Sequence, residues 1–218
     1  MVKIEDIKSD PEVIAIMAMS AKQIEALGFT EHSIRHSSIV SKWSGDILRE
    51  LGADEERIRL AEIAGYLHDI GNAVCREGHN QSGALMAYRI LTRMGMGYYD
   101  ALDIMMAIGN HDEKFGIPVS DISSALIIAD KADVHKSRVK HARDENNIHD
   151  RVNLAAERSY LTVERENRVI TLHLTINTAL CPVMDYFEIY FKRMQLCRRA
   201  AEFLGGRFSL IINDQELL

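Results

Sequence analysis

This sequence has few cysteines, no long apolar run and no excess of positive charge. Its three cysteines, Cys75, Cys181 and Cys197, are scattered and form no Cys-x-x-Cys pair, which is typical of free thiols in a reducing compartment. No apolar run approaches the roughly 18 to 20 residues that a transmembrane helix needs. The formal net charge of -6 argues against a general nucleic-acid binder, which would present a basic face.

The N-terminal residues Met1 to Asp6 also lack the apolar core that a secretory signal has. Together with the scattered cysteines, this predicts a cytoplasmic protein with no membrane partner. The length of 218 residues allows one large domain, or one domain with a small appendage.

Apolar periodicity predicts helices over most of the chain. Ser9-Asp10-Pro11 begins the first helix, with proline in its first turn, and the helix ends at Leu27-Gly28. Further helices are predicted at residues 31–51, 55–68, 80–94, 98–111 and 121–137. The charged segment 136–151 follows them. It is interpreted as a solvated helix or loop, or as a source of cations for a phosphate.

The sequence pattern changes near residue 159. Residues 160–164 and 169–176 are rich in branched and aromatic residues and alternate in polarity, which predicts a β-hairpin. A helix at 182–204 and a third strand at 208–212 complete a small β-β-α-β unit.

The fold predicted from these patterns is mainly α. Residues 1–155 would form a helical domain and residues 156–218 a small α+β appendage. The appendage contains no ligand constellation, so its expected role is packing, homodimer formation or control of access.

Histidine and aspartate recur on the apolar faces of the predicted helices. Val40, Ile47 and Leu51 follow His36 at helical spacing, and the pair His68-Asp69 ends an apolar run. An apolar core disfavours such residues because burying an unpaired polar group costs free energy. A bound metal removes that cost.

Similar patterns occur further along the chain. Ile108 precedes His111 by one turn, and Leu126 precedes Asp130 by one turn. His79 lies in a Gly-Asn-rich stretch, where it either binds a metal or caps the following helix. Four imidazoles and two carboxylates suit one or two divalent metals. The candidate ligands are His36, His68, Asp69, His79, His111 and Asp130.

This ordered set resembles the HD-domain superfamily of metal-dependent phosphohydrolases. The family pattern is a histidine, a His-Asp doublet and a later aspartate, matched by His36, His68-Asp69 and Asp130. Binuclear branches add two histidines, matched by His79 and His111. The resemblance covers roughly residues 10 to 145 and implies a helical-bundle fold. The chain departs from it at Asn72, where many members carry a lysine associated with substrate phosphate.

The resemblance also implies a ligand arrangement. Asp69 would bridge one metal, held by His36, His68 and Asp130, to a second metal held by His79 and His111. The mixed ligands suit iron, manganese, cobalt, nickel or zinc better than magnesium alone.

The implied reaction is hydrolysis of a phosphomonoester or phosphoanhydride on a small nucleotide-like substrate rather than a nucleic-acid polymer. Alternatives are a mixed-valence di-iron oxygenase on the same ligand set and a non-catalytic metal-bound sensor. The predicted catalytic residues are Asp69, Asp112 and Asp133, of which Asp112 or Asp133 would accept a proton or orient water. The predicted phosphate-binding residues are Arg76, Lys131 and Arg138.

Overall fold

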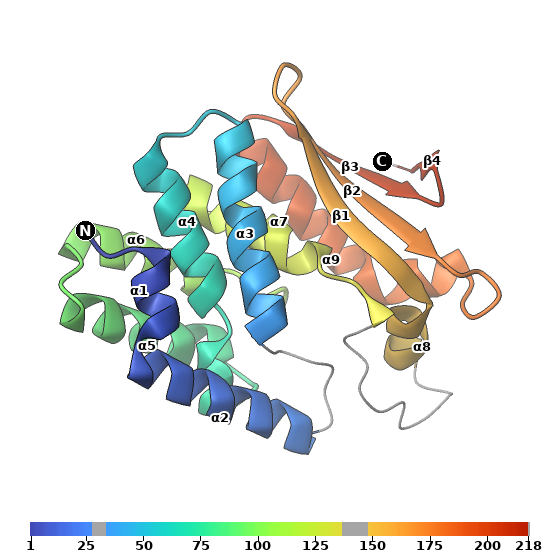
Figure 1. Cartoon of the computed structure of the whole chain (residues 1–218). Coiled ribbons are helices and arrows are strands. Elements are labelled where there is room, and N and C mark those ends of the chain that lie inside the picture. Colours follow the sequence, from blue (N-terminus) through green and yellow to red (C-terminus); the bar gives the residue numbers. More distant parts are fainter. Residues whose placement is uncertain (28–33, 137–147, 218) are drawn as a thin grey trace.

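The computed structural model describes residues 1–27, 34–136 and 148–217, with helices on one side and a twisted sheet on the other (Figure 1). The helices before the sheet are α1 (Ile4–Ser9), α2 (Pro11–Leu27), α3 (Ile34–Glu50), α4 (Glu55–Leu67), the 3-10 turn η1 (Ile70–Ala73), α5 (His79–Arg93), α6 (Tyr98–Gly109), α7 (Asp121–Ala132) and α8 (Ile148–Ala155). None of the described helices is long and apolar enough to cross a bilayer.

Local signals explain where several helices begin. The Asp54 side chain accepts a hydrogen bond from the Arg57 backbone N–H at 2.8 Å at the start of α4. The Ser120 hydroxyl caps α7 in the same way, accepting from the Ser123 N–H at 3.1 Å. The mainly α fold class is confirmed, and helices α2 to α6 lie close to the predicted segments, whereas α1 was not predicted.

One predicted helix end was wrong. The helix predicted to reach residue 137 ends at Ala132, because Asp133 has φ -78° and ψ 78°, outside the helical region. The early end brings Asp133 back toward α3. Residues 31–33 of the predicted 31–51 helix lie outside the described part of the chain.

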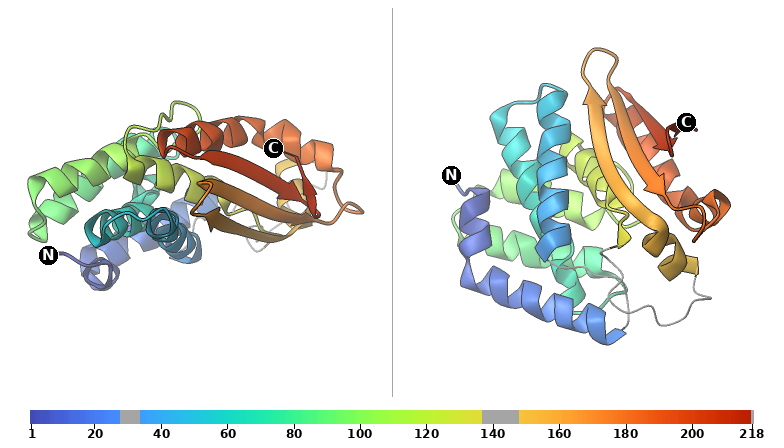
Figure 2. Two further views of the ribbon diagram at one scale, coloured as in Figure 1. Left: turned by 90° about the horizontal axis from the view of Figure 1, so that it is seen from above. Right: turned by 45° about the vertical axis from the view of Figure 1, so that its right-hand side comes forward.

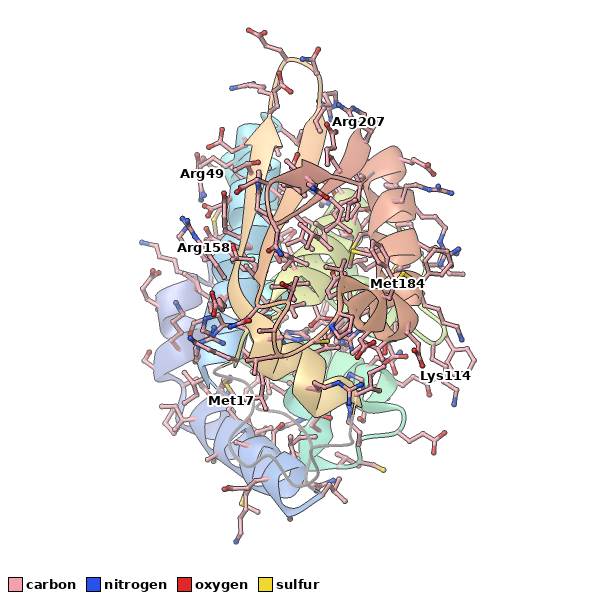
Figure 3. All side chains as sticks on the ribbon, turned by 90° about the vertical axis from the view of Figure 1, so that its right-hand side faces the viewer. Met17, Arg49, Lys114, Arg158, Met184 and Arg207 are labelled. Atoms are coloured by element: carbon pink, nitrogen blue, oxygen red, sulfur yellow. The ribbon has the colours of Figure 1, made fainter. Side chains whose placement is uncertain are left out.

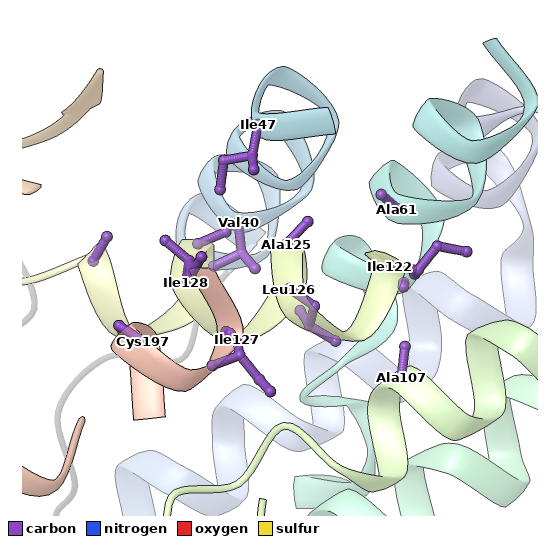
Figure 4. Packing of buried hydrophobic residues seen from close by; sticks show 14 of the residues in the cluster. Val40, Ile47, Ala61, Ala107, Ile122, Ala125, Leu126, Ile127, Ile128 and Cys197 are labelled. Carbon is purple, nitrogen blue, oxygen red and sulfur yellow. The ribbon is translucent and has the colours of Figure 1, made fainter. Parts of the chain in front are cut away.

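The helical core is centred on α7, which is buried along most of its length. Figure 4 shows Leu126 and Ile128 of α7 packed near Val40 of α3. Helices α3 and α4 approach each other at Gly65, where a Cβ atom would lie 2.7 Å from the Ser41 Cα. Only glycine fits there without moving backbone.

The C-terminal unit has the predicted β-β-α-β order, extended by a short fourth strand. Strands β1 (Ala156–Glu164) and β2 (Val169–Ile176) are antiparallel, and β3 (Arg207–Ile212) is parallel to β2. The two-residue β4 (Gln215–Glu216) pairs with β3. Helix α9 (Val183–Phe203) connects β2 to β3 and contacts α7 as well as the sheet (Figure 2).

The open face of this sheet is polar and aromatic, and Arg158 and Arg207 extend from it in Figure 3. Tyr160 and His173 lie opposite each other on β1 and β2 with ring centroids 4.5 Å apart, and the Arg158 guanidinium lies 4.6 Å from the Tyr160 ring centroid. Such cross-strand contacts stabilise the hairpin register.

One hydrophobic cluster runs through both parts of the chain. It includes Ile127 and Leu126 of α7 together with Leu172 of β2 and Leu196 of α9. The domain boundary at residue 155 and dimerisation through the C-terminal unit stay predictions.

Candidate metal centre

Six structural elements bring the six predicted ligands together. The ligands are His36 on α3, His68 at the C-terminal cap of α4, Asp69 before η1, His79 at the start of α5, His111 just after α6 and Asp130 on α7. The histidines and Asp69 are buried, and the Asp130 side chain is 12% exposed.

The first group surrounds Asp130 and one oxygen of Asp69. Asp130 Oδ1 lies 3.3 Å from His36 Nε2 and 3.6 Å from His68 Nε2. Asp69 Oδ2 lies 3.4 Å from His68 Nε2 and 3.8 Å from His36 Nε2. Both imidazoles therefore direct Nε2 at the same two carboxylates.

The second group surrounds the other oxygen of Asp69. Asp69 Oδ1 lies 3.3 Å from His79 Nε2 and 4.0 Å from His111 Nε2. The His79 and His111 ring centroids are 5.1 Å apart, the same separation as between His68 and His111. The Asp69 carboxylate thus lies between two pairs of histidines.

Hydrogen bonds at Nδ1 set the orientation of these rings. Nδ1 of His68 lies 2.8 Å from the Gly65 carbonyl oxygen, and Nδ1 of His111 lies 2.6 Å from that of Ile108. His79 makes the same contact three residues back, at 3.0 Å from a carbonyl oxygen. A carbonyl can only accept, so Nδ1 carries a proton, and the ring, once it is neutral, presents its Nε2 lone pair to the centre.

The arrangement fits a divalent metal. A lone pair facing a carboxylate oxygen is repulsive unless a proton or a cation lies between them, and His68 Nε2 is buried without a hydrogen-bond partner. Metal–ligand distances of about 2.0–2.2 Å place neighbouring ligand atoms about 3.0–3.5 Å apart, close to the shorter separations observed. Within the described part of the chain, two groups meet the spacing for an ion: His36, His68 and Asp130, and His68, Asp69 and His111.

Charge perturbs the titration of these groups. Burial lowers the pKa of His68, but the Asp69 and Asp130 carboxylates outweigh it and raise that pKa to about 10. Burial, followed by the His68 charge, holds the pKa of His111 well below its usual value. Burial raises the pKa of Asp130, but Lys131 and the neighbouring His36 and His68 imidazoles hold it well below its usual value. The Asp69 and Asp130 carboxylates therefore make the centre electrostatically favourable for a cation.

Sequence comparison identifies the family of this domain. Residues 31–137 match the model of the HD domain family. The chain contains an HD domain. The assignment predicted from the ordered histidines and aspartates is confirmed. HD domains bind divalent metals, in agreement with the two ligand groups described above.

Several relatives share this region. An uncharacterised protein of Methanocaldococcus jannaschii is 28% identical over 134 residues, covering 51% of this chain and 51% of the relative. Ribonuclease Y of Latilactobacillus sakei is 31% identical over 129 residues, covering 55% of this chain and 22% of the relative. The chain thus spans about half of the first relative's length and about a fifth of the second's.

A solved structure is also similar. A predicted HD superfamily hydrolase from an uncultured Thermotogales bacterium is 25% identical, with a TM-score of 0.45. The match covers 60% of this chain and 73% of that structure.

Asp133 and Lys131 contact the ligands of the HD domain. Asp133 Oδ2 lies 2.8 Å from His36 Nδ1, on the opposite side of the ring from the centre, and Arg35 lies 3.4 Å from the same oxygen. Lys131 is buried and its Nζ forms an ion pair with Asp130 Oδ2. Asp133 is thus placed to orient a ligand rather than to face the centre.

Arg76 reaches the centre with help from Asn72. Arg76 Nη1 lies 3.9 Å from Asp69 Oδ1 and donates to the Asn72 Oδ1 at 3.2 Å. The buried Asn72 amide in turn donates to the Asp69 carbonyl oxygen at 3.0 Å. At residue 72, where the family resemblance suggested a lysine, this chain has an asparagine that accepts a hydrogen bond from Arg76.

The two remaining predicted site residues are Asp112 and Arg138. The Asp112 carboxylate accepts from the Lys114 backbone N–H at 2.9 Å, so its described contact shapes the turn after His111. Arg138 lies outside the described residues.

An ion pair between Glu113 and Arg193, beside the HD site, was not predicted from the sequence. Glu113, two residues after His111, pairs with Arg193 of α9. The two residues are 80 positions apart, and no local pattern predicts such a contact. Only a prediction of how α9 packs could have found it.

Proposed function

We propose that this HD domain is a binuclear metal-dependent phosphohydrolase. Its substrate would be a phosphomonoester or phosphoanhydride of a small nucleotide-like molecule. The main observation in support is the position of Asp69, whose Oδ2 faces His36 and His68 while its Oδ1 faces His79 and His111. A carboxylate with both oxygens used in this way suits a bridge between two cations.

The six residues divide into two ligand sets. His36, His68 and Asp130 would hold one metal with Asp69 Oδ2, and His79 and His111 would hold the other with Asp69 Oδ1. The metals would be iron, manganese, cobalt, nickel or zinc. When bound, such a pair would polarise a phosphoryl group and make water a nucleophile near neutral pH.

Residues around the ligands have separate roles in this proposal. Arg76, oriented by Asn72, would bind a phosphoryl oxygen beside Asp69, since its side chain is 31% exposed and stays accessible. Lys131 would keep Asp130 ionised and add positive charge. Asp133 would hold the His36 ring, and Asp112 stays the candidate for proton transfer.

A second candidate substrate is an RNA phosphodiester. Ribonuclease Y of Dehalococcoides mccartyi is 40% identical over 79 residues, and the name describes an RNA-cleaving enzyme. That alignment covers 14% of the relative, and the net charge of -6 disfavours a polyanion. We therefore rank the small phosphorylated substrate first.

The test is a reconstitution assay. Metal-free protein is loaded with manganese, iron, cobalt, nickel or zinc and incubated without oxygen with nucleoside mono-, di- and triphosphates and with an oligoribonucleotide. We expect phosphate release from at least one nucleotide. Cleavage of the oligonucleotide alone would favour the second candidate. Oxygen consumption by the reduced-iron form, without anaerobic hydrolysis, would establish the oxygenase, and inactivity with every metal would favour a sensor.

Ligand variants test the two-metal arrangement independently of substrate. Asp69→Ala should lose most of both metals, whereas His79→Ala and His111→Ala should retain about one equivalent. His173→Ala, on the open face of the sheet, is the matched control and should retain the wild-type content. Two equivalents in both the His79 and His111 variants would refute the binuclear proposal.

A further inference from the structure

The turn that follows His111 is tied to the C-terminal unit. Glu113 lies in this turn, and Arg193 lies on α9. Arg193 Nε donates to one Glu113 carboxylate oxygen, and its Nη2 lies 3.4 Å from the other. This two-point contact matches the planar guanidinium to the planar carboxylate, so it fixes direction as well as distance.

The Arg193 side chain is itself held in place by its packing on Tyr190. Its guanidinium carbon lies 4.6 Å from the centroid of the Tyr190 ring, one turn earlier on α9. The buried Tyr190 hydroxyl donates to Asn153 Oδ1 of α8 at 3.1 Å. The guanidinium is therefore presented to Glu113 by a packed surface rather than by a freely moving side chain.

The turn's other bonds are weaker anchors. Gly116 N–H donates to the Asp112 carbonyl oxygen at 2.6 Å, which shapes the turn without linking it to another element. Lys114 lies 3.5 Å from Glu77, but these side chains are 65% and 87% exposed, and such pairs contribute little. The Phe115 side chain is 71% exposed. Among the described contacts of this turn, the ion pair between Glu113 and Arg193 thus links it to the rest of the fold more strongly than the pair between Lys114 and Glu77 does.

We propose that Arg193 is a positioning residue for the metal subsite of His79 and His111. The inference rests on the proposed binuclear function. His111 is two residues from Glu113, and its Nε2 lies 4.0 Å from Asp69 Oδ1, the longest of the four histidine separations from the nearest carboxylate. Small movements of the turn should therefore disturb the position of His111 before that of the other three histidines. The C-terminal unit, through α9, would set the affinity for the second metal.

The experiment measures metal binding by itself. Metal-free full-length protein is titrated with Mn²⁺ by calorimetry, and the two affinities are resolved. In Arg193→Ala we expect the affinity for the second ion to fall roughly 10- to 100-fold while that for the first is unchanged. Arg193→Lys should restore part of the loss, because it keeps the charge but not the two-point contact.

Matched variants separate positioning from general stability. Arg198→Ala removes an exposed arginine from the same helix and should bind both ions as the wild type does. Glu113→Ala should reproduce the Arg193→Ala loss, and the double variant should lose no more than either single variant. In a His111→Ala background, Arg193→Ala should have no further effect on metal binding.

The outcomes are distinct. Arg193→Ala with wild-type affinity for both ions, even with a lowered melting temperature, would refute the inference and leave the proposed function intact. Equal loss of both ions would show a general structural role and also refute it. Wild-type protein binding a single ion would refute the binuclear function and the inference together. Should Arg193→Ala fail to fold, the charge-exchanged pair Glu113→Arg with Arg193→Glu provides the test, with restored second-ion affinity expected.

Discussion

Asp133 holds His36 from behind: its Oδ2 lies 2.8 Å from the His36 Nδ1, while Nε2 of the same ring faces the metal centre. A carboxylate in this position fixes the tautomer and the orientation of the ring, as is common for histidine ligands. The relationship exists because α7 ends at Ala132 and the chain turns toward α3 at Asp133.

The first prediction follows from that contact. Asp133→Ala should weaken binding of the metal held by His36 roughly 10- to 100-fold. Asp133→Asn should be milder, because the amide oxygen can still accept from Nδ1. Calorimetric titration of metal-free protein measures both. Equal affinity in the alanine variant and the wild type would show that Asp133 does not control the ligand.

The second prediction concerns pH. Because the pKa of His68 is raised to about 10, metal-free protein carries an imidazolium there at neutral pH, and a metal must displace that proton. Affinity for the first ion should therefore rise about tenfold per pH unit between pH 7 and 9. Competition with a chelator of known pH dependence measures it. A flat profile would mean that His68 is already neutral.

The same shift predicts a stability trend in metal-free protein. The folded-state pKa of about 10 lies above the ordinary 6.5, so protonation of His68 contributes fully below pH 6.5. That contribution is lost as the pH rises through about 10. Urea unfolding at pH 6.5 and 9.5 should show the decline in wild type and a smaller decline in His68→Gln. The same slope in both proteins would assign the decline to other groups.

The third prediction tests an ion network away from the metal centre. Arg57 of α4 contacts Asp103 of α6 and Asp121 at the start of α7. Because one guanidinium joins three helices, Arg57→Ala should destabilise the fold by about 1–2 kcal/mol. Lys42→Ala, which breaks an exposed pair with Asp46, should change stability by less than about 0.5 kcal/mol. Chemical unfolding at neutral pH measures both, and equal effects would contradict the network's role.

The fourth prediction addresses the relation between the two parts of the chain. Leu196 is fully buried on α9, the helix that contacts both α7 and the sheet. Leu196→Ala should destabilise the protein by about 2–5 kcal/mol and lower a single melting transition, because the core is continuous. Calorimetry distinguishes the alternatives. Two transitions, with only one shifted, would mean that residues 156–218 unfold independently.

The sequence by itself determined the helices, the hairpin and the inward side chains of the candidate ligands. These features depend on local periodicity. His36 and Asp130 each share a helix face with apolar residues that recur at the spacing of about one turn. The carbonyl contacts of His68, His79 and His111 are local too, since each reaches three residues back.

Only the tertiary structure decided how these residues meet. The division of the Asp69 oxygens between two histidine pairs and the placement of Asp133 behind His36 both depend on angles between helices. The contact between Glu113 and Arg193 depends on α9 packing against α7. Hydrophobic periodicity specifies which face of a helix is buried, but it carries no information about which distant helix covers that face. Ångström-scale contacts between distant residues are therefore set by packing of the whole core.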